Sequence, residues 1–330
     1  MELGDRAVAP IDDAQPALVP RENAAAHRPV AGLSATAGLT LLSLCALWGL
    51  NFVAIKVGNN GFPPMLAAAL RSVGAAVLIG VWAVARRQRL GGPPRLLLHG
   101  TVTGFLFALE FIFLYAGTSY TSASRATLLV YTSPFWVALG AHWLLPGDRL
   151  RAVKIGGLAL SFLGVLAVFR APGGGLAPSH LRGDVLEVCA AISWAATTLY
   201  IKRFIQPFGV SPLQTLFYQV AFSAPLLVFA AVVAGQAQPE AWRLDSVLAL
   251  VYQTVVVATF SYLVWFWLLQ RNQASALHSF TFFAPLFGVI FAGFLLGDHL
   301  PLLLWAGLAL VAAGTYLVNR SPRRGSTARA

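Results

Sequence analysis

Glu110 is the side chain whose chemistry is hardest to accommodate in this sequence. It lies in the apolar run FALEFIFLYAG, roughly two-thirds of the way across a predicted membrane-spanning segment. An ionised carboxylate at that depth costs about 2.5–3.5 kcal/mol, so it must face a cavity, meet a partner or be neutral. A functional role would be to carry a proton or to contact a substrate cation. The structural alternative is a carboxylate held by Arg71 or by a backbone donor.

Three cations lie in or beside apolar runs. Arg71 lies about two turns inside the second run. It either pairs with Glu110 or extends towards the membrane surface, and a structural role is favoured. Lys56 and Lys202 lie near opposite membrane faces, where long side chains reach the headgroups. Binding of an anionic substrate is the alternative for both lysines.

Polar and aromatic residues inside the apolar runs are the candidates for a solute cavity. Trp48 and Trp194 fall in the middle of their runs, away from the interfacial belt where tryptophan is usually enriched. With Asn51, one turn beyond Trp48, they are predicted to line a central cavity, and core packing is the alternative. Weaker candidates of the same kind are Tyr115, Tyr131 and Tyr262.

Two prolines lie early in apolar runs. Pro134 and Pro285 each remove a backbone hydrogen bond and are predicted to kink their helices. Carbonyl groups freed at such kinks can face a solute path, although a purely structural kink is equally compatible with the sequence. His142 and His278 have apolar surroundings, which favours pairing with a neighbour over metal binding. No metal site and no cofactor is predicted.

The composition excludes a soluble globular protein. Of 330 residues, 58% are hydrophobic and 11% are charged, whereas soluble domains carry about 25% charged residues. The net charge of +11 comes from basic residues that lie mostly between apolar runs. This placement indicates membrane orientation rather than nucleic-acid binding. Cys45 and Cys189 lie inside apolar runs, which argues against a disulfide scaffold.

Ten apolar stretches are long enough to cross a bilayer, which takes roughly 17–25 residues. They are residues 38–57, 65–85, 96–118, 127–145, 153–169, 185–201, 213–234, 247–269, 276–296 and 302–318. Because backbone groups in lipid must be satisfied internally, and the alternating pattern of a barrel is missing, these stretches are predicted to be helices. The expected fold is an all-α integral membrane protein with ten transmembrane helices.

The connecting segments predict the orientation. One alternating set carries fourteen Lys and Arg residues and the other carries four. The positive-inside rule places the richer set, and with it both termini, in the cytoplasm. Residues 1–35 mix acidic, basic and proline residues without an apolar core. They are predicted to be a disordered cytoplasmic tail rather than a signal peptide, and residues 321–330 a basic cytoplasmic tail.

An internal repeat divides the chain into residues 36–170 and 183–320. GLAL at 157–160 returns at 307–310, and TSPFWVALG at 132–140 resembles FAPLFGVIF at 283–291. Trp48 precedes Lys56 by the same spacing as Trp194 precedes Lys202. Five helices per repeat is an odd number, so the second repeat must enter the membrane from the opposite side. Such inverted repeats are widespread in secondary transporters.

The motifs resemble those of the EamA family of the drug/metabolite transporter superfamily. The resemblance rests on Trp48-Gly49-x-Asn51-Phe52-x-x-x-Lys56, Pro64, Arg71, Pro134 and Gly147-Asp148, and on Trp194, Lys202, Pro285 and Gly297-Asp298 in the second repeat. Gly-Asp replaces the Gly-Glu that often follows the fourth and ninth helices of this family. The resemblance implies alternating access between two five-helix halves. It also implies a small metabolite as cargo, such as an amino acid, often moved outward.

The expected protein is a multi-pass transporter of the plasma (inner) membrane, acting on a small-molecule substrate and surrounded by lipid. Protons are a candidate coupling ion, and monomer versus dimer is left open. A phosphorylated-sugar or organic-anion carrier is the alternative within the superfamily, since related carriers use membrane lysines. The sequence contains none of the catalytic motifs that a membrane enzyme would need. It also shows no selectivity filter or charged ring, which argues against a receptor or channel.

Overall fold

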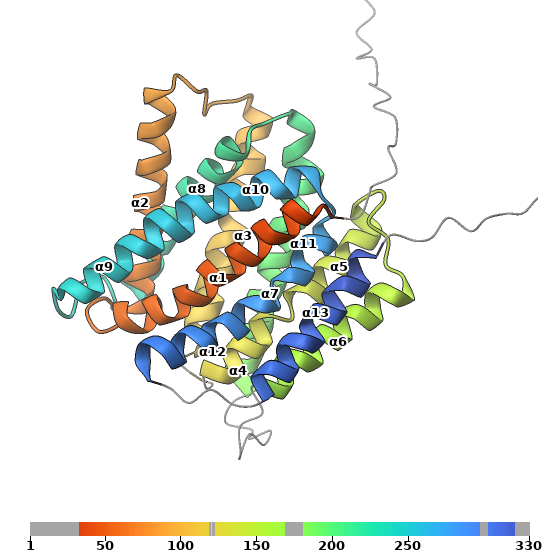
Figure 1. Ribbon diagram of the computed structural model, residues 1–330. Coiled ribbons are helices and arrows are strands. Elements are labelled where there is room, and N and C mark those ends of the chain that lie inside the picture. The colour runs from red at the N-terminus through yellow and green to blue at the C-terminus, as the bar shows by residue number, and fades with distance from the viewer. Residues whose placement is uncertain (1–32, 119, 121–122, 169–180, 298–302, 321–330) are drawn as a thin grey trace, which may run out of the picture. The chain divides into compact units, whose positions relative to one another are not determined.

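A computed structural model describes residues 33–118, 120, 123–168, 181–297 and 303–320. Within these ranges the chain is helical and has no strand (Figure 1). The elements are α1 Ala35–Gly58, α2 Pro64–Ala85, α3 Pro94–Thr118, α4 Ala123–Val130, α5 Ser133–Leu144, α6 Ala152–Val168, α7 Leu181–Tyr200, η2 Ile201–Ile205, η3 Gln206–Phe208, α8 Pro212–Val233, α9 Leu244–Tyr252, η4 Gln253–Ser261, α10 Tyr262–Arg271, α11 Ala274–Phe280, α12 Phe283–Leu296 and α13 Leu303–Asn319. Residues 1–32 and 321–330 of the predicted tails lie outside the described residues, as does Asp298.

The helices confirm an all-α membrane protein. Seven apolar helical segments in the described part are long enough to cross a bilayer, and shorter apolar helices cover 152–167 and 303–319. The predicted stretch 127–145 corresponds to two short helices, α4 and α5. Ten spans and two inverted repeats stay predictions.

Two of the predicted spans are interrupted at matching places. The first breaks at Tyr131 and Thr132, between α4 and α5, and the second breaks at Thr281 and Phe282, between α11 and α12. Pro134 and Pro285 lie in the first turn of α5 and α12. Proline fits there because the first backbone N–H groups of a helix have no intrahelical acceptor. The helix therefore breaks ahead of each proline, and helical geometry resumes one residue before Pro134 and two residues before Pro285.

Helices α6 and α13 lie side by side and contact through glycine (Figure 1). A Cβ atom on Gly157 would lie 2.6 Å from the carbonyl oxygen of Gly314, and one on Gly164 would lie 2.7 Å from that of Gly307. Between these contacts, Ser161 Oγ donates to the Val311 carbonyl oxygen at 3.3 Å. Only small residues allow two backbones to approach so closely, a packing mode common between membrane helices.

The central helices converge on one region. Helix α1 packs against α12, and α3 packs against α7 and α8. Glycine again permits close contact, since a Cβ atom on Gly49 would lie 2.5 Å from that of Phe287. A Cβ atom on Gly104 would lie at the same distance from that of Phe222. These contacts hold the middle of α1 against α12 and the middle of α3 against α8.

A π-helical segment runs through the span Leu244–Arg271. The wide-turn segment η4, Gln253–Ser261, lies between α9 and α10. Its last residue, Ser261, donates to the Val257 carbonyl oxygen at 2.6 Å and accepts a hydrogen bond from Trp48 Nε1 at 2.9 Å. π-Helical turns are rare and occur frequently at functional sites. Here the segment positions Tyr262 and Trp265, which follow it directly.

Candidate functional site

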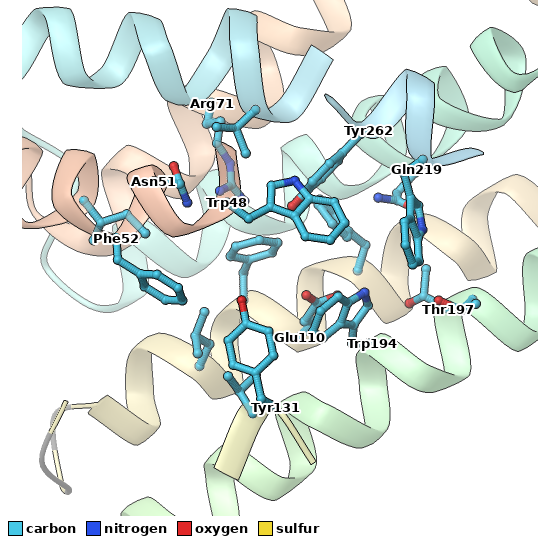
Figure 2. A pocket seen from close by; sticks show the side chains of 18 of the residues that line it. Trp48, Asn51, Phe52, Arg71, Glu110, Tyr131, Trp194, Thr197, Gln219 and Tyr262 are labelled. Atoms are coloured by element: carbon cyan, nitrogen blue, oxygen red, sulfur yellow. The ribbon is translucent and has the colours of Figure 1, made fainter. Parts of the chain in front are cut away.

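A cavity of about 140 Å³ lies where the central helices meet (Figure 2). It is mostly aromatic and aliphatic, with a few polar side chains. Its lining residues are Trp48, Asn51, Phe52, Ile55, Arg71, Phe107, Glu110, Phe111, Leu114, Val130, Tyr131, Trp194, Thr197, Thr198, Gln219, Val257, Tyr262, Trp265 and Phe266. Trp48, Asn51, Glu110, Tyr131, Trp194 and Tyr262 are among the residues that the sequence suggested for a cavity.

Arg71 and Glu110 contribute opposite charges to this lining. Arg71 is 2% exposed and Glu110 is 8% exposed. The Arg71 guanidinium lies 4.1 Å from the centroid of the Phe111 ring, in cation–π contact. Its Nε and Nη2 atoms and the Oε2 atom of Glu110 have no hydrogen-bond partner. Across the described residues no ion pair joins Arg71 to Glu110, so both charges are available to a third group.

Aromatic side chains hold the cavity walls in place. The Trp48 ring lies 5.3 Å from that of Trp265 and 6.4 Å from that of Tyr262, in edge contacts. Trp194 makes a similar contact with Tyr131 at 5.9 Å. The hydrogen bond from Trp48 to Ser261 further fixes the indole. The apolar part of the cavity is therefore formed by rings whose orientation is set by their neighbours.

Equivalent positions of the internal repeat meet in the cavity. Trp48 corresponds to Trp194, and Asn51, three residues after Trp48, corresponds to Thr197. Arg71 corresponds to Gln219, because each follows a proline by seven residues, and the position related to Glu110 is near Tyr262. All eight line the cavity.

The sequence interpretation missed Gln219 and Thr197 as site residues. The signal was present, because the repeat spacing relates each of them to a candidate in the first half. Gln219 is buried and its Oε1 atom has no hydrogen-bond partner.

Several other candidates lie away from the cavity lining. Lys56 is exposed. Lys202 donates to the carbonyl oxygens of Leu269 and Asn272, at the end of α10. The ring of Tyr115 lies 6.0 Å from that of Phe111, behind the lining. Neither lysine is placed to bind a solute in this cavity.

His278 lies directly behind the cavity wall. It is fully buried, and its Nε2 atom is 3.0 Å from Thr198 Oγ1. Its ring contacts Trp194 at 5.3 Å and Trp265 at 5.1 Å. The described residues include no group of three or more His, Cys, Asp or Glu side chains that could hold a metal ion. His278 therefore supports the lining through its neighbours.

Asp148 joins two distant parts of the chain. Its Oδ2 atom accepts from the backbone N–H of Ser275 at 3.0 Å, at the beginning of α11. Lys154 Nζ lies 2.6 Å from Asp148 Oδ1 and donates to Ser275 Oγ at 2.9 Å. Gln273 Nε2 donates to the Gly147 carbonyl oxygen at 2.7 Å. This network, centred on the buried Asp148, fastens the α5–α6 connection to the start of the second broken span.

Comparison with known proteins identifies transporters. The sequence model of the EamA-like transporter family matches residues 36–170 and again residues 181–320. A protein of Salmonella typhimurium named "Probable amino-acid metabolite efflux pump" is 30% identical over 293 residues, covering 85% of this chain and 93% of that protein. The "Uncharacterized transporter YoaV" of Bacillus subtilis is 25% identical, covering 84% of this chain and 95% of that protein.

A solved crystal structure shares the fold. It superposes with a TM-score of 0.72 and covers 86% of this chain and 96% of that chain. The two sequences are 20% identical, so this likeness concerns the helical architecture alone.

Proposed function

This chain belongs to the EamA-like transporter family, and from that premise we propose that it exports a small metabolite such as an amino acid. Export would proceed by alternating access across the plasma membrane. Two relatives, from Salmonella typhimurium and Escherichia coli, carry the name "Probable amino-acid metabolite efflux pump" at 30% and 28% identity. Family membership favours transport over the alternatives of a membrane enzyme, a receptor or a channel.

The proposal of an amino acid as cargo rests on one observation. The cavity contains one buried cationic side chain, Arg71, and one buried acidic side chain, Glu110, that do not form an ion pair. A buried charge needs a partner to offset its lost hydration. An α-amino acid brings both partners, a carboxylate for Arg71 and an ammonium group for Glu110. Arginine suits the first task because its planar guanidinium matches a carboxylate in bidentate geometry.

The size and the remaining lining refine the proposed cargo. A cavity of about 140 Å³ is smaller than the roughly 300–1,000 Å³ typical of sites for drug-sized ligands. Trp48, Trp194 and Tyr262 present ring surfaces (Figure 2) that would pack against an apolar side chain. Trp265 adds a further ring to the same lining. We infer that small to medium apolar amino acids fit best, with both charged groups directed towards the first half of the chain.

Alternating access requires two halves that move against each other, and the packing of α6 and α13 supports inverted repeats. Gly157 corresponds to Gly307 in the repeat, and Gly164 corresponds to Gly314. Gly157 contacts Gly314 while Gly164 contacts Gly307, so exchanging the repeats maps these contacts onto each other. The equivalent helices run antiparallel at this contact. That pattern is expected of ten spans arranged as five-helix repeats, residues 36–170 and 183–320, about an axis in the membrane plane.

We further propose that Glu110 senses or carries a proton during transport. A deeply buried carboxylate can be neutral when it lacks a partner and charged when a cation or water reaches it. Arrival of the cargo ammonium group would then favour release of the proton. We predict that both termini lie in the cytoplasm. The cavity would then lie between a cytoplasmic membrane face rich in basic residues and an outer membrane face with fewer of them.

The decisive experiment is solute counterflow in proteoliposomes. Vesicles loaded with unlabelled amino acids would be tested with labelled apolar L-amino acids, the corresponding decarboxylated amines and the corresponding deaminated acids. Saturable exchange of the amino acids, with much weaker exchange of compounds lacking either charge, is expected. Exchange of deaminated acids as strong as that of amino acids would contradict the role of Glu110. Recovery of chemically altered solute would indicate an enzyme instead.

A further inference from the structure

Glu187 is a buried carboxylate that lies outside the cavity lining. It lies on α7, is 0% exposed, and neither of its carboxylate oxygens has a hydrogen-bond partner. It lies near one end of the predicted span 185–201, yet its side chain is fully buried. Its carboxylate lies against Gly117 of α3, where a Cβ atom would be 2.6 Å from Oε1. The missing side chain of Gly117 makes the room that Glu187 occupies.

Glu110 and Glu187 lie along the same contact, between helices α3 and α7. On α3, Gly117 comes seven residues after Glu110, so both lie on the same face, roughly 10 Å apart along the helix. On α7, Trp194 of the cavity comes seven residues after Glu187, and the same rule applies. Because α3 packs against α7, Glu187 lies along this α3–α7 contact, about two turns from the cavity.

Among the side chains that the structure describes, no cation pairs with Glu187. On its own helix, Asp184 is one turn away and carries like charge, and the Arg182 guanidinium lies 4.2 Å from the Tyr120 ring centroid. On α3 the titratable groups in the half that contains Gly117 are Tyr115 and Glu110, and Arg95 and His99 lie near the opposite end of the helix. Helix α4 also packs on α7, and its Arg125 side chain lies outside the described residues. Helix α5 meets α7 at the other end, where Gly140 contacts Leu199.

We propose that Glu187 is a second proton-binding site, distinct from Glu110, which holds a proton while the α3–α7 contact is closed. An ionised carboxylate buried without donors is strongly disfavoured in a membrane. A metal cation would need several more oxygen ligands, whereas a proton neutralises the group alone. When water enters the α3–α7 contact, ionisation becomes favourable and the proton leaves.

The equivalent position in the first repeat indicates which residue could replace Glu187. By the spacing that relates Trp194 to Trp48, Glu187 corresponds to Leu41, which is fully buried in α1. Glu187→Leu therefore places an apolar residue of similar size in a site that the fold already fills with leucine elsewhere. Replacing a buried polar group by an apolar one of similar volume is commonly neutral or stabilising, so this variant is expected to fold.

Infrared difference spectroscopy of the purified full-length protein in lipid tests the proposal without any cargo. At neutral pH the Glu110→Gln protein, in which Glu110 contributes no band, should show the carbonyl stretch of a protonated carboxylic acid. This band should be lost when Glu187→Leu or Glu187→Gln is added. It should persist when the control Asp184→Asn, which removes a partly exposed carboxylate from the same helix, is added instead. An unchanged band after addition of Glu187→Leu, or its absence from Glu110→Gln, would overturn the proposal.

The use of this proton in transport rests on the function proposed above. Glu187→Leu should keep the cargo KM of the wild type and shift the pH dependence of transport. An unchanged pH profile would overturn this use. If the wild-type protein moved no amino acid, the proposed transport would fail while the infrared result on Glu187 would still stand or fall independently.

Discussion

The two halves of the chain share a scaffold but place different chemistry in the same cavity. The first half contributes Arg71 and Glu110, and the second half contributes Gln219 and Tyr262 at the related positions. Backbone features are repeated, including the broken spans and the glycine contacts of α6 and α13. Repetition of the scaffold would allow movement between two equivalent arrangements. Concentration of charge in one half would hold a zwitterion in a single orientation.

Arg71→Gln is the strongest test of this difference, because it gives the first half the side chain of the second. Truncating one partner of a buried charge contact costs about 2 kcal/mol or more, which weakens amino-acid binding roughly thirty-fold. Equilibrium binding of a labelled apolar amino acid to purified protein would measure the loss. Arg243→Gln, which changes an exposed arginine paired with Asp245, should leave the affinity unchanged. Affinity within twofold of the wild type in Arg71→Gln would remove Arg71 from the site.

Glu110→Gln keeps the shape of the side chain and removes its titration. The variant should insert in the membrane and still bind cargo, with lower affinity because the ammonium group loses its carboxylate partner, and its transport should lose the pH dependence of the wild type. Counterflow in proteoliposomes over a series of pH values would measure this, with Asp245→Asn as a control for an exposed carboxylate.

A pH profile identical to that of the wild type would mean that Glu110 is structural. If the variant fails to fold, the better account is loss of the electrostatic attraction between Glu110 and Arg71, which act across the same cavity without an ion pair. In that case Arg71→Ala should be comparably damaging.

The repeated glycine contact can be tested from either half. A Cβ atom on Gly314 would lie 2.3 Å from the carbonyl oxygen of Gly157, so Gly314→Ala should destabilise the protein by about 1–3 kcal/mol. Gly157→Ala should have a similar effect, because the two positions lie on the same contact. Thermal unfolding in detergent would measure both variants.

Gly156→Ala is the matched control for the glycine contact. This neighbouring position has no atom within 4 Å of an added Cβ, and alanine favours the helix by about 0.5–1 kcal/mol. The control should therefore be neutral or slightly stabilising. Equal unfolding temperatures for Gly156→Ala and Gly314→Ala would contradict close packing of α6 and α13.

The smallest expected difference concerns the two equivalent tryptophans. Trp48→Phe removes the hydrogen bond to Ser261 and should cost about 1 kcal/mol of stability. Trp194→Phe keeps an aromatic ring against Tyr131 and should cost less. Unfolding temperatures of the two variants, measured side by side, test this ranking. A larger loss for Trp194→Phe would reverse it.

Trp48, Trp194 and Asn51 were chosen because they are amphipathic or polar residues in the middle of apolar runs, and the two tryptophans also recur with the repeat. Polar groups are costly in lipid, so such residues are expected to turn inward whatever the details of packing, and all three line the cavity. Three tyrosines were chosen on the first criterion alone, and one of them, Tyr115, lies outside the lining.

The sequence alone determined that the chain is an all-α membrane protein of the EamA family with a repeated pattern, because hydropathy and motif spacing are local properties. Tertiary structure decided the rest. Arg71 stacks on Phe111 instead of pairing with Glu110, and Glu187 is enclosed by α3. These helices are apolar on nearly every side, so their periodicity specifies weakly which face turns inward. That choice depends on where small residues such as Gly117 let a neighbouring helix approach, which follows from the packing of helices distant in the chain.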